Sequence, residues 1–81
     1  MVANPDLSAA IHDALRAELP ADDFSLVMRV DVSTGWGDIH LVSVYSKLSR
    51  RDAGDQHEET ILRIVNRVLA DGRSVARIIW A

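Results

Sequence analysis

The chain has 81 residues, which is enough for one small domain but not for a second hydrophobic core. Its formal net charge of −3 weighs against nonspecific binding to nucleic acid, because proteins that contact a polyanion over a broad surface are usually basic. The sequence contains no cysteine, which excludes disulfides and thiolate metal sites and favours a cytoplasmic location. No apolar run approaches the roughly 18 to 20 residues of a membrane span, and the first residues lack a signal-peptide pattern. We therefore expect no membrane partner.

The first predicted element is a helix that follows Asn4 and ends before Pro20. Asn4 is a favourable N-cap residue, and Pro5 suits the first helical position because its missing N–H needs no partner there. Apolar residues then recur at helical spacing: Leu7, Ala10, Ile11, Ala14 and Leu15. Pro20 cannot continue this helix.

Two strands and a tight connection follow the first helix. Residues 24–33 alternate between apolar and polar side chains, with one apolar face formed by Phe24, Leu26, Met28, Val30 and Val32. Residues 34–38 contain two glycines and an aspartate between β-type runs, which predicts a hairpin turn. Residues 39–48 are expected to form the second strand.

A polar loop over residues 48–54 should lead into a second helix. Asp55 and Glu58 have the spacing of a capping box, which predicts the start of that helix. Its buried stripe would consist of Ile61, Leu62, Val65, Val68 and Leu69. Gly72 is well placed to be the left-handed residue at its end. Residues 73–80 are rich in β-branched side chains and are expected to form the last strand.

The order of elements is therefore αββαβ in a single domain over residues 1–81. We expect an α+β fold, a two-layer sandwich in which both helices cover one face of a three-stranded mixed sheet. The first two strands should be antiparallel. The second and third should be parallel, because the helix between them returns the chain to the same end of the sheet. Which of the first two strands borders the third stays open.

This order of elements resembles that of BolA-like and class II KH-like domains, small folds that bind nucleic acid or protein partners. The likeness covers the whole chain but is one of topology alone. No Gly-x-x-Gly segment joins two helices, since Gly54 precedes the second helix. Arg50 and Arg51 are followed by an aspartate, where BolA-like proteins have an arginine–histidine pair after the second strand. No functional residue is therefore carried over.

The hydrophobic pattern does not match a sheet that is covered on one face only. The second strand is apolar on both sides, and so is the third, where Val75 and Ile79 alternate with Ala76, Ile78 and Trp80. Covering a few such side chains is worth several kcal/mol at about 25 cal/mol per Å². We therefore expect a noncatalytic protein-interaction or regulatory module, homodimeric through the open sheet face or bound there to another protein. The expected partner-binding residues are Trp36, Ile39, Leu41, Tyr45, Arg77 and Ile79.

A nucleic-acid or phosphate binder is the alternative function. Lys47, Arg50 and Arg51 cluster near the start of the second helix, where backbone N–H groups favour an anion. Trp36, between two glycines, could stack on a base, anchor a protein partner, or fold back over its own hairpin.

The sequence contains no recognisable catalytic or metal-binding motif, and we expect neither enzymatic activity nor a cofactor. The histidines lack metal-ligand spacing: His12, His40 and His57. A small enzyme or metal site centred on His57 and Glu58 is the remaining possibility. Gly35 and Gly37 lack the lysine and the glycine spacing of phosphate loops.

Overall fold

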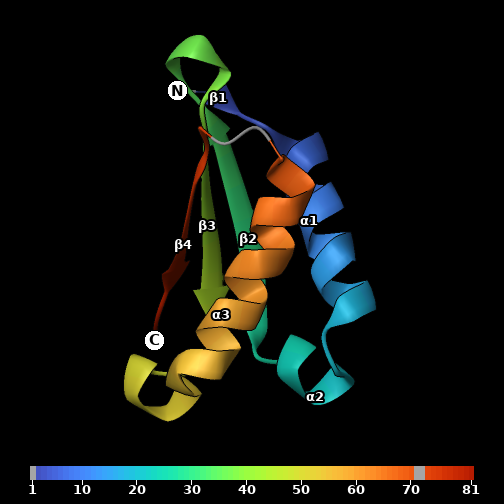
Figure 1. The fold of residues 1–81 in the computed structure, drawn as a ribbon, viewed down its shortest axis with the longest axis vertical. Helices are drawn as coiled ribbons and strands as arrows, with labels where there is room; N and C mark the ends of the chain where they lie inside the picture. The colour runs from blue at the N-terminus through green and yellow to red at the C-terminus, as the bar shows by residue number, and fades with distance from the viewer. Residues whose placement is uncertain (1, 71–72) are drawn as a thin grey trace.

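The computed structural model describes residues 2–70 and 73–81, in which four strands form one mixed sheet with the order β1-β2-β3-β4 (Figure 1). The strands are β1 (Val2–Ala3), β2 (Val27–Thr34), β3 (His40–Ser46) and β4 (Val75–Ile79). The helices are α1 (Pro5–Glu18), α2 (Ala21–Phe24) and α3 (Arg50–Leu69), and η1 is a 3-10 turn (Trp36–Asp38). The predicted α+β class is confirmed, but the three-stranded sheet and the αββαβ order are wrong in detail.

The pairing of the three long strands agrees with the sequence pattern. β2 and β3 form an antiparallel hairpin around η1, and β3 and β4 are parallel. The open question of strand order is answered, since β4 borders β3. Both β3 and β4 are shorter than predicted, and Trp80 lies just beyond the end of β4.

The fourth strand is the short β1, which pairs antiparallel with the far end of β2. Val2 lies opposite Thr34, and the N–H of Asn4 donates to the Val32 carbonyl at 2.9 Å. Two residues are too few to show an alternating pattern, and the sequence therefore gave no sign of this strand.

Helix α1 begins and ends as predicted. The Asn4 side-chain oxygen accepts a hydrogen bond from the Leu7 N–H at 3.1 Å, which caps the helix. Ile11 and Leu15 are completely buried. The chain then forms the short α2 rather than entering a strand, so the predicted strand start at Phe24 is wrong. Two aspartates in the first turn of α2 favour a helical N-terminus there.

A bulge in β2 changes which side chains reach the core. The pairing with β3 shifts between Val27 and Arg29, so that Val27 is buried while Met28 is 60% exposed. The prediction that Met28 faces the core is therefore wrong. Beyond the bulge, Val30 and Val32 are buried as expected.

Helix α3 starts earlier than the capping-box pattern predicts. Its N-cap is Ser49, whose hydroxyl accepts from the Asp52 N–H at 3.3 Å, so residues 50–53 are helical rather than a polar loop. Gly54 then breaks the helix with φ +75° and ψ 164°, and the regular helix continues from Asp55. At the other end, Ala70 is the left-handed residue. The predicted role of Gly72 lies outside the described residues.

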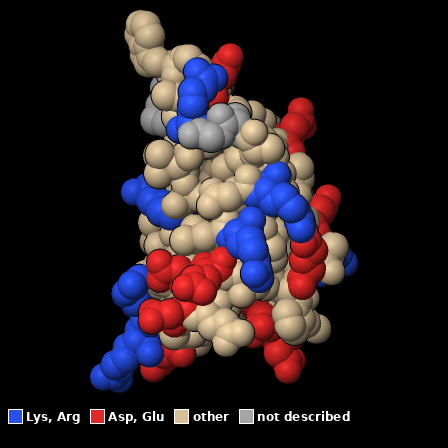
Figure 2. All heavy atoms as spheres, viewed as in Figure 1, with Lys and Arg blue, Asp and Glu red and all other residues tan. Residues whose placement is uncertain are grey.

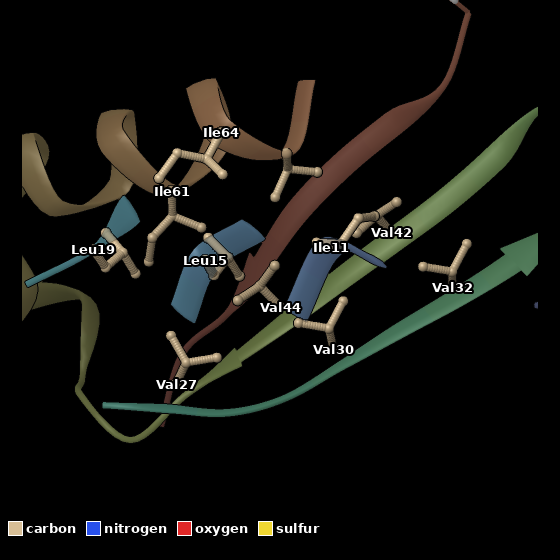
Figure 3. Close-up of a cluster of buried hydrophobic side chains, with 11 residues drawn as sticks. Ile11, Leu15, Leu19, Val27, Val30, Val32, Val42, Val44, Ile61 and Ile64 are labelled. Carbon is tan, nitrogen blue, oxygen red and sulfur yellow. The ribbon is translucent and has the colours of Figure 1, made fainter. Parts of the chain in front are cut away.

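The core lies between the helices and one face of the sheet. Figure 3 shows valine side chains of β2 and β3 pointing toward α1 and α3. The buried cluster consists of Ile11, Leu15, Leu19, Val27, Val30, Val32, Val42, Val44, Ile61, Ile64 and Val65. In the part of the chain that the structure describes, no helix is long and apolar enough to cross a membrane.

Candidate functional site

The face of the sheet opposite α1 and α3 carries no helix among the described elements, and we call it the open face. Alternation along the strands places every second side chain there, since the intervening ones belong to the core. Its members are Arg29, Asp31 and Ser33 of β2, Leu41, Ser43 and Tyr45 of β3, and Val75, Arg77 and Ile79 of β4.

The strand register arranges these nine residues in three rows across the sheet. The Tyr45 row contains Arg29, Tyr45 and Ile79. The Ser43 row contains Asp31, Ser43 and Arg77. The Leu41 row, which is nearest to the hairpin turn, contains Ser33, Leu41 and Val75. Two rows are thus apolar on β3 and β4, and the row between them is polar.

The apolar side chains of the open face shield one another only partly. Leu41, Tyr45 and Ile79 are half-buried, and Val75 is 55% exposed. The isolated chain therefore leaves an apolar strip partly in water along β3 and β4, made of Leu41, Tyr45, Val75 and Ile79 and interrupted in the middle by Ser43 and Arg77.

Polar contacts hold the charged side chains of the open face in place. The Arg29 guanidinium lies over the Tyr45 ring, and its Nε is 3.4 Å from a carboxylate oxygen of Asp31. The interaction with Tyr45 and, secondarily, the Asp31 charge raise the pKa of Arg29, which stays a cation. Across the other strand pair, Arg77 Nε donates to the Ser43 hydroxyl at 3.0 Å.

Four of the six predicted partner-binding residues lie together on this face: Leu41, Tyr45, Arg77 and Ile79. Ile39 lies one residue before β3, in the connection from η1, and Trp36 lies within η1. The predicted set did not include the other five members of the open face: Arg29, Asp31, Ser33, Ser43 and Val75. The alternation along β2 and β4 was the signal that could have placed Asp31 and Val75.

Trp36 does not fold back over its hairpin, because the residue is 95% exposed. The tight turn that presents it includes Gly37, whose φ of +65° is a left-handed conformation suited to glycine. Val2 is also largely exposed and lines a shallow hollow with Trp36. The tip of the hairpin is therefore a second, smaller apolar surface.

The basic residues of the alternative site lie far from this tip. Arg50 and Arg51 begin α3 at the end of the molecule opposite to η1 (Figure 1). Arg50 is paired with Glu58 at 2.7 Å. Figure 2 shows acidic and basic side chains intermixed on the side that it displays. Trp36 and the cluster of Lys47, Arg50 and Arg51 therefore do not form one continuous surface.

The three histidines lie on different elements of the fold: His12 on α1, His40 on β3 and His57 on α3. His40 Nδ1 is 2.9 Å from the Thr34 hydroxyl, as expected for a satisfied sheet residue. His12 is half-buried, with its ring edge-on to Phe24 at a centroid distance of 5.2 Å. His57 lies 6.4 Å from the Trp80 ring. Over residues 2–70 and 73–81, no three histidine or acidic side chains come together as a metal site.

Comparisons with protein-family models, with curated proteins and with solved structures found no significant match to this chain. The function must therefore be argued from the open face itself.

Proposed function

We propose that this chain is a noncatalytic protein-interaction module that forms a homodimer through the open face. The observation that carries the proposal is the strip of Leu41, Tyr45, Val75 and Ile79 on the sheet face that the helices leave bare. Exposed apolar side chains gathered on one face among polar residues often mark an interaction site, and symmetric dimers are the commonest soluble assemblies. The absence of cysteine in the sequence favours a cytoplasmic setting for this assembly.

The size of the open face predicts a weak association. Three strands and five residue positions span an area of about 14 by 17 Å. Even allowing for side-chain relief, this flat footprint of about 240 Å² falls below the roughly 800 Å² of accessible surface that each partner of a standard stable interface buries. We therefore expect a dissociation constant in the micromolar range, and a measurement of assembly has to extend to about 100 µM protein.

The test is sedimentation velocity of the wild type and of Leu41→Asp over that concentration range. Leu41 lies at the centre of its row, and a charge there should abolish dimerisation while circular dichroism and thermal unfolding show a folded monomer. Met28→Asp is the matched control. Met28 is exposed but lies beside Pro5 and Ser8 of α1, and this variant should dimerise like the wild type.

Two results would overturn the proposal. One is a wild type that stays monomeric at the highest concentration. The other is a dimer that survives Leu41→Asp, because the contact would then lie elsewhere, for example on the free edge of β4. Bound nucleic acid released by salt would instead favour the alternative that uses Lys47, Arg50 and Arg51.

A further inference from the structure

The Ser43 row carries opposite charges at equal distances from its centre. Asp31 on β2 and Arg77 on β4 flank Ser43, each one strand away from it. Strands in a sheet are about 4.8 Å apart, so the two charged positions are separated by roughly 10 Å. Asp31 pairs with Arg29 and Arg77 donates to Ser43 within the chain, but the Asp31 side chain is about half exposed and Arg77 is exposed, so both can also contact a partner.

Two sheets that pack face to face as a symmetric dimer can be related by a two-fold axis that lies in the interface plane, either along the strands or across them. An axis along β3 places the β4 of one subunit over the β2 of the other and keeps the rows in order. An axis across the strands places each strand on its own counterpart and exchanges the Tyr45 row with the Leu41 row. The charges of the Ser43 row behave differently in these two arrangements.

With the axis along β3, Asp31 faces Arg77 of the partner subunit, and the same pair forms again at the other end of the row. Tyr45 then faces its counterpart, and so does Leu41. With the axis across the strands, Asp31 faces Asp31 of the partner subunit, and Arg77 faces Arg77 of the partner subunit. Like charges in close contact across an interface cost several kcal/mol.

We infer that two copies of this chain pack with the two-fold axis along β3, and that Asp31 and Arg77 determine this arrangement. The inference rests on the proposed function and specifies its partner contact. In this dimer both hairpin tips lie at the same end, so the two Trp36 side chains are neighbours. The other arrangement would place the tips at opposite ends.

Charge exchange tests the contact between Asp31 and Arg77. Asp31→Arg alone and Arg77→Asp alone should each weaken dimerisation about tenfold or more, because like charges then face each other in both pairs. The double variant restores opposite charges and should return to within about threefold of the wild type. Sedimentation velocity gives the dissociation constants, and circular dichroism reports whether each variant is folded.

The position of the hairpin tips provides an independent readout. The chain has no cysteine, so Trp36→Cys creates a single labelling site outside the open face. Spin-label distances should be about 10 to 20 Å, given sheets packed about 10 Å apart and crossed at about 30°. Tips at opposite ends would be about 45 Å apart, since the turn of each subunit lies about seven residues from Ser43 at roughly 3.3 Å per residue.

The outcomes separate this inference from the proposed function. Short tip distances together with rescue in the double variant support the axis along β3. The orientation of the axis is overturned if Leu41→Asp abolishes the dimer but the tips are far apart. It is also overturned if the double variant fails to restore dimerisation. In both cases the proposed dimer through the open face stands. A dimer that survives Leu41→Asp, or a monomer throughout, overturns both.

Discussion

The guanidinium of Arg29 lies over the ring of Tyr45, with Cζ 4.2 Å from the ring centroid. The pair spans β2 and β3, and it partly covers the apolar strip of the open face in the free chain. In the dimer with the axis along β3, Arg29 would face Ile79 of the partner subunit. Its charge would then lose water without gaining an opposite charge from the partner.

We therefore predict that Arg29→Met strengthens dimerisation. Methionine keeps an unbranched apolar side chain over Tyr45 but has no charge to desolvate. The dissociation constant measured by sedimentation should fall about three- to tenfold. Arg63→Met removes an exposed arginine of α3 and should leave the constant unchanged. A weaker dimer for Arg29→Met would show that the guanidinium itself binds the partner.

Asn4 connects the start of α1 to the sheet, and its two side-chain atoms can be tested separately. The oxygen accepts from the Leu7 N–H at 3.1 Å, and the amide nitrogen donates to the Thr34 hydroxyl at 3.3 Å. Asn4→Ala loses both bonds and should lower the free energy of unfolding by about 1 to 2 kcal/mol. Asn4→Asp keeps the acceptor and should cost less than about 1 kcal/mol. Urea unfolding measures both, and an equal loss would assign the effect to Thr34 rather than to the cap.

Much of the fold could be predicted from local patterns. The alternation before and after the glycine-flanked Trp36 predicted the β2–β3 hairpin, and the helical stripe around Ile61 predicted a crossover and hence a parallel β4. The bulge at Met28 could not be predicted, because it leaves no trace in the hydrophobic pattern of β2. It alters only the pairing of β2 with β3. Strand β1 could not be predicted either, because it is held by its pairing with the end of β2 rather than by a pattern of its own.

The candidate site could also be predicted only where it depends on a local pattern within one strand. Alternation within one strand placed Leu41 and Tyr45 on a common face. The placement of Asp31 and Arg77 on either side of Ser43 depends on the pairing register of strands that are distant in the chain. The spacing of residues in the sequence does not predict that register. The exposure of Trp36 was left open by the sequence, because the same turn could have directed the indole over the strands.

Gly54 interrupts α3 in a backbone conformation that is almost exclusive to glycine, with φ +75° and ψ 164°. A Cβ placed there would meet no atom within 4 Å, so a substitution is penalised by the backbone alone. Gly54→Ala should therefore lower the free energy of unfolding by about 1 to 3 kcal/mol.

Gly37→Ala is the matched comparison for this variant. Gly37 has φ +65° and ψ 27°, a left-handed conformation that costs other residues only about 1 to 2 kcal/mol. Urea unfolding of the two variants should show the larger loss at Gly54. Equal or smaller loss at Gly54 would mean that residues 50–53 can join the regular helix without a break.

His57 carries a buried ring nitrogen, Nε2, that has no hydrogen-bond partner among the described residues. Its ring lies against Trp80, and a surface hollow of about 470 Å³ between α3 and the Leu19–Pro20 corner lies beside it. An unpaired buried polar atom costs about 1 to 3 kcal/mol when water cannot replace its partner. The His57→Phe variant removes that atom and keeps an aromatic ring beside Trp80.

We therefore predict that His57→Phe leaves the free energy of unfolding unchanged or raises it by up to about 1 kcal/mol. His12→Phe is the control and should change it by no more than about 0.5 kcal/mol, because His12 has no buried unpaired nitrogen. Thermal unfolding with and without added zinc separates this structural role from a metal site at His57 and Glu58. A melting temperature that zinc raises in the wild type but not in His57→Phe would contradict the structural role, because binding to the folded state alone stabilises it.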